Sequence, residues 1–209
     1  MRIFENRDCM DGMKEYPDKF FELAIVDPPY GIGINMNQGR RSGDIKKHAA
    51  KDWDAPPGQG YWDELFRCSE RLIVWGANNF PLASNGWIVW DKDITGDVDF
   101  SRCELAYTNF LGHIERFESR AQSGNETYSN KIHPTQKPVA LYKWLLKNYA
   151  HEGDKILDTH VGSASSLIAC EEMGFDYVGF ELDKDYYEAA QKRLTEYRRQ
   201  LKLDLTELQ

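Results

Sequence analysis

Cysteine is scarce in this sequence, and the few cysteines are not arranged in pairs. The four among 209 residues lie far apart, at Cys9, Cys68, Cys103 and Cys170. That spacing fits neither a disulfide framework nor a Cys-x-x-Cys zinc site. Scattered free thiols are typical of a reducing compartment, so the sequence predicts a cytoplasmic location.

Long apolar runs are also missing. No stretch approaches the roughly 20 apolar residues that cross a bilayer, and residues 1–8 lack the apolar core of a signal peptide. The sequence therefore predicts no membrane association. Its 41% hydrophobic content, with six Trp, ten Phe and eleven Tyr, is nevertheless typical of a folded chain. One domain spanning 1–209 can form a sizeable core, whereas two domains would be cramped.

The most unusual motif of the chain is the turn Asp27-Pro28-Pro29-Tyr30. It ends the apolar run 23–26, which is typical of a buried strand. The two prolines stop the strand and stiffen the chain that follows. Asp27 and Tyr30 should therefore lie at the carboxyl edge of a sheet, where α/β proteins bind ligands. A carboxylate beside a flat ring suits a planar ligand that carries an amino group.

Positive charge is outnumbered, with 26 Lys and Arg against 34 Asp and Glu and a net charge of -8. A general nucleic-acid binder should be basic, and this chain is not. The exception is a local cluster formed by Arg40, Arg41, Lys46 and Lys47. Such a run is usually a solvated surface. This one directly follows the Asp-Pro-Pro-Tyr turn, which favours contact with phosphates.

A second ligand-binding pattern lies near the carboxyl end. The strand 155–158 ends in Asp158 and leads into a loop of small residues containing Gly162. A dinucleotide fingerprint would need three glycines, so a nicotinamide site is not indicated. The next strand, 177–181, ends in Glu181, whose carboxylate can accept hydrogen bonds from ribose hydroxyls. Alternatively, Glu181 caps the helix that follows.

Two further segments have weaker signals. Asp8 follows a short strand, and it would lie beside Asp27 if the two strands were neighbours in the sheet; its alternative role is a helix cap. The segment 133–138, His-Pro-Thr-Gln-Lys-Pro, leads into a helix over 139–149. Lys137 would add positive charge to a helix N-terminus that already attracts anions, unless it is simply solvated.

The remaining pattern predicts an α/β fold. Helices are expected over 11–16, 61–71, 167–173 and 185–201, and strands over 2–5, 72–75, 87–90 and 103–108. Their alternation favours a mostly parallel sheet with helices on both faces. Two stretches, 31–60 and 112–132, show no steady period and are interpreted as loop insertions.

With these motifs in place, the chain resembles the DNA amino-methyltransferases of the permuted beta group. In that family the Asp-Pro-Pro-Tyr motif comes first and the S-adenosylmethionine loop comes last, as here at 27–30 and 158–166. The resemblance implies a circularly permuted, Rossmann-like fold with a seven-stranded sheet. One departure lies in the loop, where the family commonly has Asp-Pro-Phe-x-Gly-Ser-Gly-Thr and this chain has Thr159, His160 and Ala164. Alanine tolerates fewer backbone conformations than glycine.

The resemblance implies a role for each matching position. Asp27, Pro28, Pro29 and Tyr30 would be catalytic and hold the target base. The cofactor would contact a larger set: Asp8, Cys9, Asp27, His133, Thr135, Lys137, Asp158, Gly162, Ser163, Glu181 and Leu182. Recognition of DNA would fall to the two loop insertions, with Arg40, Arg41, Lys46 and Lys47 on phosphates or guanines.

The implied reaction is methyl transfer to an exocyclic amine of double-stranded DNA, with no metal. The base would be flipped out of the duplex and stacked on Tyr30. Asp27 at the first motif position favours adenine N6, because cytosine-N4 relatives mostly have serine there. No Pro-Cys dipeptide occurs, so the cysteine chemistry of C5-cytosine methylation is not expected.

Several alternatives stay open at this point. They are cytosine-N4 methylation, a catalytically silent scaffold subunit, an RNA methyltransferase and, least favoured, a nucleotide-binding oxidoreductase. Two short loops form a small DNA reader, which favours a short recognition site or a homodimer. The resemblance also raises a cognate restriction nuclease as a partner and a bacterial or phage origin.

Overall fold

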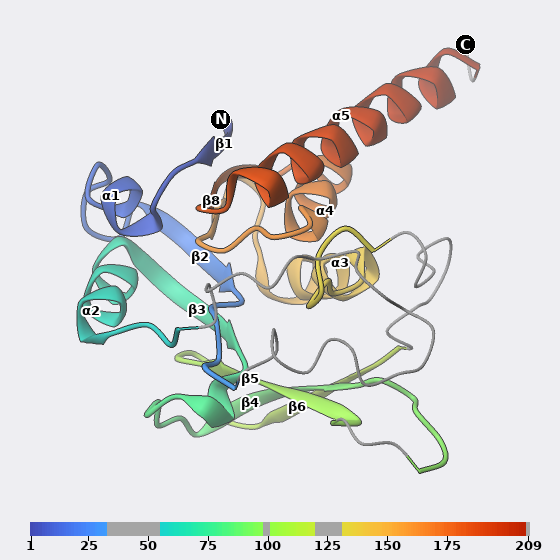
Figure 1. The fold of residues 1–209 in the computed structure, drawn as a ribbon. Coiled ribbons are helices and arrows are strands. Elements are labelled where there is room, and N and C mark those ends of the chain that lie inside the picture. The colour runs from blue at the N-terminus through green and yellow to red at the C-terminus, as the bar shows by residue number, and fades with distance from the viewer. Residues whose placement is uncertain (33–54, 98–100, 120–130, 208–209) are drawn as a thin grey trace.

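A single sheet lies at the centre of the protein (Figure 1). The computed structural model describes residues 1–32, 55–97, 101–119 and 131–207, with side chains as far as Leu201. Within those residues the sheet has eight strands in the order β1-β8-β7-β2-β3-β5-β4-β6. Their bounds are β1 (Arg2–Asn6), β2 (Phe21–Val26), β3 (Ser69–Trp75), β4 (Gly86–Asp91), β5 (Cys103–Thr108), β6 (Ile114–Glu118), β7 (Lys155–Asp158) and β8 (Asp176–Glu181).

The strand pairings confirm a mostly parallel sheet. Only β5 runs against its neighbours, pairing antiparallel with both β3 and β4. The sheet has one strand more than expected, and the prediction of an irregular segment over 112–132 is wrong for β6, which pairs with β4. Its sequence, Ile-Glu-Arg-Phe-Glu, carries three charges because it forms an edge of the sheet. Because three of its five residues are charged, the segment lacks the apolar run that predicts a strand.

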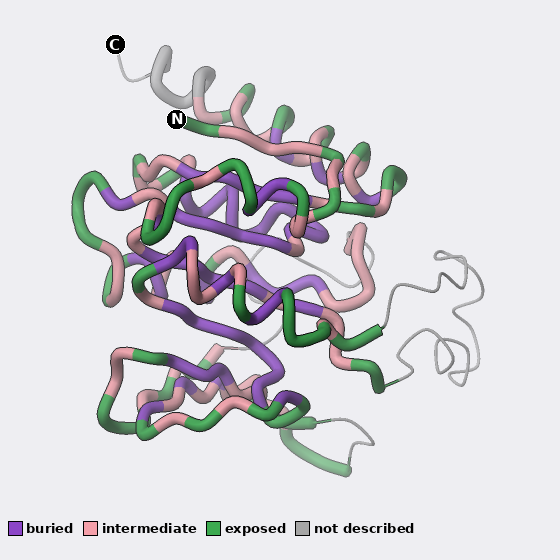
Figure 2. The backbone as a smooth tube through the Cα atoms, turned by 90° about the vertical axis from the view of Figure 1, so that its left-hand side faces the viewer, coloured by how far each residue is buried: buried purple, intermediate pink, exposed green. Residues whose placement is uncertain are grey.

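Helices cover both faces of the sheet (Figure 1). Alternating residues of β2 explain this, because Leu23 and Ile25 belong to one core cluster, and Ala24 and Val26 to the other. Two helices and a short 3-10 turn cover one face, and three helices cover the other: α1 (Cys9–Met13), α2 (Gln59–Cys68) and η2 (Ala77–Asn79), then α3 (Val139–Tyr149), α4 (Ser165–Met173) and α5 (Lys184–Glu207). Buried backbone concentrates in the sheet between them (Figure 2).

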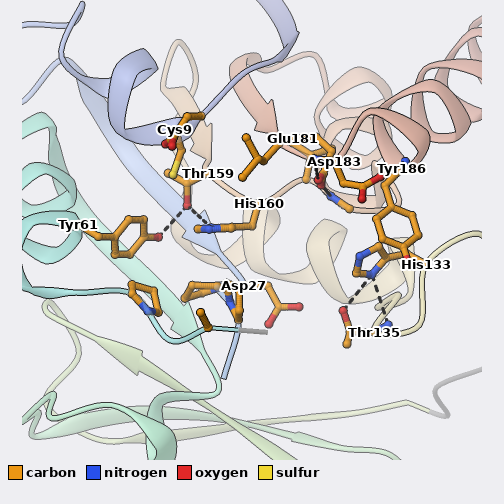
Figure 3. Close-up of a pocket in the computed structure, with 18 of the residues that line it drawn as sticks. Cys9, Asp27, Tyr61, His133, Thr135, Thr159, His160, Glu181, Asp183 and Tyr186 are labelled. Carbon is orange, nitrogen blue, oxygen red and sulfur yellow. Dashed lines mark hydrogen bonds between the residues drawn. The ribbon is translucent and has the colours of Figure 1, made fainter. Parts of the chain in front are cut away.

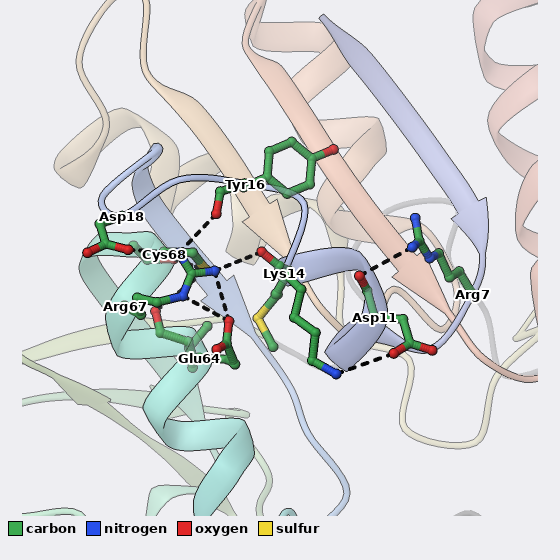
Figure 4. A network of polar contacts seen from close by, with 11 residues as sticks. Arg7, Asp11, Lys14, Tyr16, Asp18, Glu64, Arg67 and Cys68 are labelled. Atoms are coloured by element: carbon green, nitrogen blue, oxygen red, sulfur yellow. Dashed lines mark hydrogen bonds and ion pairs between the residues drawn. The ribbon is translucent and has the colours of Figure 1, made fainter.

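Among the helices, the bounds differ most from expectation at three: α1 was predicted over 11–16, α5 over 185–201, and α2 shows the physical cause of its shift. This helix was predicted over 61–71 but ends at Cys68, because Ser69 already pairs with Phe21 of β2. Arg67 fastens α2 to the end of α1 and to the segment after it: its guanidinium donates to the main-chain oxygens of Met13 and Tyr16, at 3.0 and 2.9 Å (Figure 4). The contact fixes the position of α2. None of the helices described here has the length and apolar character needed to span a membrane.

The strand order assembles one acidic edge. Strands β1, β8, β7 and β2 lie side by side and parallel. Asp8, Glu181, Asp158 and Asp27 therefore follow one another along their carboxyl ends. The conditional expectation that Asp8 neighbours Asp27 is wrong, because β8 and β7 separate β1 from β2. The chain reverses its direction of winding between β7 and β2, the position where α/β sheets bind ligands.

Candidate active site

A cavity of about 1010 Å³ opens at this edge of the sheet (Figure 3). Small-molecule sites span roughly 300–1,000 Å³, so it has the volume for more than one ligand group. Thirteen of the candidate residues line it: Asp8, Cys9, Asp27, Pro28, Pro29, Tyr30, His133, Thr135, Lys137, Gly162, Ser163, Glu181 and Leu182. Asp158 is not among its lining residues, and Arg40, Arg41, Lys46 and Lys47 lie outside the described residues.

Glu181 organises one end of the cavity. Its Oε2 accepts the Gly162 N–H at 2.8 Å, and its Oε1 accepts the Asp183 N–H at 2.9 Å. Burial raises the pKa of Glu181, while these backbone N–H groups oppose the shift. A carboxylate has about four lone-pair sites, so two remain for ligand hydroxyls. The alternative that Glu181 caps the helix is wrong, because Asp183 Oδ1 accepts the N–H groups of Asp185 and Tyr186 at the start of α5, at 2.9 and 3.1 Å. Glu181 fastens the turn before α5 and lines the cavity.

Asp8 and Asp158 support the wall by local hydrogen bonds. Asp8 is the N-cap of α1, and its Oδ1 accepts the Met10 N–H at 2.8 Å. The Asp158 carboxylate accepts the His160 N–H at 3.0 Å and the Ser166 hydroxyl. Burial raises the pKa of Asp158 to about 7. Asp158 thus holds the loop after β7 in its conformation, since it bonds both the start of the loop and the first turn of α4.

Ala164 lies in that loop with a left-handed backbone, at φ 62°. Glycine adopts this region freely, whereas a residue with a Cβ is strained there by roughly 1–2 kcal/mol. The departure from the family loop therefore falls on a position that suits glycine. Gly162, two residues earlier, has φ 54° and keeps the expected residue.

A hydrogen-bonded chain of three side chains forms the floor of the cavity. The Tyr61 hydroxyl lies 2.7 Å from Thr159 Oγ1, which lies 2.9 Å from His160 Nδ1 (Figure 3). The rings of Tyr61 and His160 also meet edge to face, with 5.5 Å between centroids. The sequence marks Thr159 and His160 only as departures from the family motif, and no local pattern indicates a role for Tyr61. Tyr61 reaches the site because α2 packs across the sheet.

His160 should make stability depend on pH. Burial lowers its pKa to about 4, against about 6.5 for an unfolded histidine. Between these values the unfolded chain binds more protons, so the contribution of His160 to stability rises with pH and is lost on acidification. We expect His160→Phe to raise the Tm of the cofactor-free protein, relative to wild type, by about 5–10 °C more at pH 4.5 than at pH 7.5.

Thermal unfolding curves between pH 4.5 and 7.5 measure that difference. A Tm difference between His160→Phe and wild type that stays constant across this range would contradict the buried, neutral imidazole.

Asp27 organises the other end of the cavity. Its Oδ1 accepts the Tyr30 O–H at 2.5 Å, and its Oδ2 accepts Lys137 Nζ at 2.5 Å. Burial raises the pKa of Asp27, and the Lys137 ammonium opposes that shift. With an ammonium at this distance, we assign an ionised carboxylate. The expectation of a solvated Lys137 is wrong, since its side chain is only 3% exposed.

The Tyr30 ring has a fixed place beside Asp27. It meets Phe80 edge to face at 6.0 Å between centroids. On the other side lies Gly76, with φ 70°, where a Cβ would approach the ring to 2.1 Å. Glycine is therefore required at position 76 on two grounds. No local sequence pattern marks Gly76 as part of the site, because the sequence does not show which ring packs against it.

The rim of the cavity carries a third group of side chains (Figure 3). The Thr135 hydroxyl lies 3.1 Å from His133 Nδ1, and the His133 ring meets Tyr186 of α5 at 4.3 Å between centroids. The segment before α3 and the first turns of α5 thereby share one wall. Leu182, whose surface is 69% exposed, adds an apolar side chain beside it. Such an arrangement can hold a ligand with both polar and flat apolar parts.

Comparison with known proteins gives this site a context. A family model described as DNA methylase matches residues 50–192. Type II methyltransferase M.HpaI of Haemophilus parainfluenzae is 39% identical over 226 residues, covering 90% of this chain and 72% of its own. Type II methyltransferase M.HinfI of Haemophilus influenzae is 22% identical over 240 residues, covering 90% of this chain and 67% of its own.

A solved structure supports the fold. The complex of M1.HpyAVI with SAM has a TM-score of 0.59 and 17% identity, over 92% of this chain and 100% of its own. The cavity described above fits that cofactor: the Glu181 carboxylate lines it with lone pairs left for hydroxyl groups, and Gly162 and Ser163 line it beside Glu181. Together, the family match over most of the chain and the 39% identity to M.HpaI show that this chain belongs to the DNA methylase family and is a DNA methyltransferase that uses S-adenosylmethionine.

Proposed function

We propose that this protein methylates the N6 amine of adenine at a specific DNA sequence. The observation that carries the proposal is the Asp27 carboxylate, set at the cavity wall between Tyr30 and Lys137. An ionised acceptor at the head of the motif distinguishes this site from relatives with a neutral serine hydroxyl there. The cavity volume supports the simultaneous presence of a cofactor and a flipped base.

The chemistry asks little more of the protein than positioning. An exocyclic amine is a poor nucleophile, because its lone pair is delocalised into the aromatic ring. The Asp27 carboxylate and the Pro28 carbonyl would accept the two amino hydrogens, which favours a tetrahedral nitrogen with its lone pair free. S-adenosylmethionine supplies the electrophilic methyl group when it is bound. Holding the reacting atoms about 3–3.5 Å apart would provide much of the acceleration.

The target adenine must leave the duplex to reach Asp27. Tyr30 supports this step, because its ring lines the cavity and is held in place by Phe80 and Gly76. Stacking of a base on an aromatic ring contributes roughly 1–3 kcal/mol. That contribution offsets part of the cost of unstacking the base. Arg40, Arg41, Lys46 and Lys47 are proposed to contact the DNA around the flipped base.

Expression in a host without DNA methylation tests the proposal. The host DNA is then sequenced with reads sensitive to modified bases. We expect N6-methyladenine at one short recurring sequence, which also gives the recognition site. N4-methylcytosine at such a sequence would overturn the choice of adenine as the target base. It would leave the proposed binding of an exocyclic amine by Asp27 and Pro28 in place. Unmodified DNA would overturn the proposal as a whole, provided that the purified protein is folded.

A further inference from the structure

Four charged side chains form a buried cluster beside the proposed target site. Lys137 Nζ lies 2.5 Å from Asp27 Oδ2 and 3.2 Å from Glu104 Oε2. Lys92 Nζ lies 2.8 Å from the other carboxylate oxygen of Glu104. Two ammonium groups thus balance two carboxylates. Glu104 comes from β5, the antiparallel strand, and it has no part in the motifs of the family.

Asp27 already accepts two hydrogen bonds, one on each carboxylate oxygen. Tyr30 donates to Oδ1 and Lys137 to Oδ2. A carboxylate has about four lone-pair sites, so an amino group that donates to Oδ2 would share this oxygen with the Lys137 ammonium and compete with it. The amine would bind more strongly if the ammonium moved away, but a buried ammonium without an acceptor is strongly destabilised. Release of the ammonium therefore requires a second acceptor for Lys137 within a short distance.

Glu104 meets that requirement. Its Oε2 atom is buried, and no donor among the described residues makes a hydrogen bond to it. The Lys137 ammonium is already 3.2 Å away, close but not aligned for a hydrogen bond. Buried carboxylate oxygens are normally paired. A small rotation of the Lys137 side chain would pair this one and release Asp27.

We propose that Glu104 is a positioning residue for methyl transfer, which receives the Lys137 ammonium when the target amine takes its place on Asp27. The proposal rests on the function proposed above. Lys92 keeps Glu104 in place through the other oxygen, so the carboxylate can accept Lys137 without moving itself. Lys137 stays paired throughout, and the exchange needs no change in the net charge of the cluster.

The test compares wild type with Glu104→Gln, which keeps the shape of the side chain and removes its charge. Two duplexes carry the recognition site found by sequencing, one with adenine at the target position and one with purine, which lacks the amine. Kd is measured for both in the presence of S-adenosylhomocysteine. In wild type, we expect the amine to strengthen binding by about tenfold or more, as befits a hydrogen bond to a charged group.

In Glu104→Gln we expect that preference to fall to about twofold or less, because Lys137 stays on Asp27. The kcat/KM value for the adenine duplex should fall about tenfold or more with it. Affinity for the purine duplex and for the cofactor should stay within about threefold of wild type, since neither needs Asp27 released. A structural role alone would weaken both duplexes equally. An unchanged preference for adenine would overturn the inference.

Two further variants keep the test decisive. Asp18→Asn removes the charge of an exposed carboxylate that pairs with Arg67 away from the cavity, and we expect it to keep the wild-type preference for adenine. If Glu104→Gln does not fold, Glu104→Asp replaces it. We expect this variant to prefer the adenine duplex less than wild type does but more than twofold. A preference equal to that of wild type would contradict the inference. If wild type methylates DNA and the Glu104 variant keeps the wild-type preference for adenine, this inference is overturned and the proposed function stands. Wild type that methylates no DNA overturns the proposed function and the inference with it.

Discussion

Asp27→Ala should abolish methyl transfer while leaving cofactor binding largely intact. Asp27 is the carboxylate that the target amine would contact, and its other neighbours are side chains of the same site, Tyr30 and Lys137. The cofactor end of the cavity depends instead on Glu181 and the loop at Gly162. Removing an interaction made only in the transition state lowers kcat without weakening ground-state binding. We expect turnover to fall by about 10³-fold or more, the scale reported for the loss of an oriented catalytic group.

The measurement pairs transfer of a labelled methyl group to DNA with calorimetric titration of S-adenosylmethionine. Asp18→Ala is the matched control: Asp18 is an exposed carboxylate whose ion pair with Arg67 lies away from the cavity. It should match wild type in both measurements. Turnover within tenfold of wild type in Asp27→Ala would remove Asp27 from the mechanism. Lost turnover together with lost cofactor affinity would show that Asp27 supports the whole cavity instead.

The candidate site was predictable where its signal is local. The turn at Asp27 is recognisable from two prolines after an apolar, β-branched run. Glu181 is recognisable as an acidic residue at the end of a strand. Both positions follow from covalent geometry and strand burial, which act over a few residues. The order of the strands does not follow so directly. Asp8 lies after a strand just as Asp27 does, yet β8 and β7 separate them, because pairing is decided by the packing of distant segments.

The residues that were missed share a cause. Glu104 lies on β5, and nothing in the strand sequence marks it. Its proposed role depends on its ion pair with Lys137, which lies 33 positions later in the segment before α3. Gly76 and Tyr61 are similar, since each is defined by one partner far along the chain, Tyr30 for the first and Thr159 for the second. A sequence without an alignment carries no record of such pairs. Local patterns predict the ends of strands, whereas tertiary packing decides what meets there.

Lys137→Met should be the most destabilising single change in the site. The variant keeps the length of the side chain but leaves two buried carboxylates, Asp27 and Glu104, without their shared ammonium. Removing one partner of a buried ion pair typically costs about 3–5 kcal/mol. For a chain of this size we therefore expect Tm to fall by about 10 °C at pH 8. Lys143→Met is the matched control on the surface of α3, where a paired lysine contributes about 1 kcal/mol or less.

The pH dependence of this loss identifies its origin. In wild type the two ammonium groups overcome the effect of burial and lower the pKa of Glu104 to about 2, and Lys137 opposes the raised pKa of Asp27. Without Lys137 both carboxyl groups should bind protons more readily in the folded state. The stability of Lys137→Met should then fall, relative to wild type, as pH rises from 4 to 8. Thermal unfolding of the cofactor-free proteins across that range measures the difference.

A second substitution separates lost charge balance from lost packing. Adding Asp27→Asn to Lys137→Met removes the charge of the carboxylate that has lost its ammonium, since Glu104 still pairs with Lys92, and it leaves the shape of the site nearly unchanged. We expect the double variant to recover part of the lost Tm at pH 8 and little at pH 4, where protonation has already relieved the repulsion. Equal recovery at both values would assign the loss to the other contacts of the lysine side chain, whose Nζ lies 5.8 and 5.6 Å from the ring centroids of Tyr30 and Trp75. In that case, charge compensation by Lys137 would not explain how Asp27 is kept in place and ionised for binding an amine.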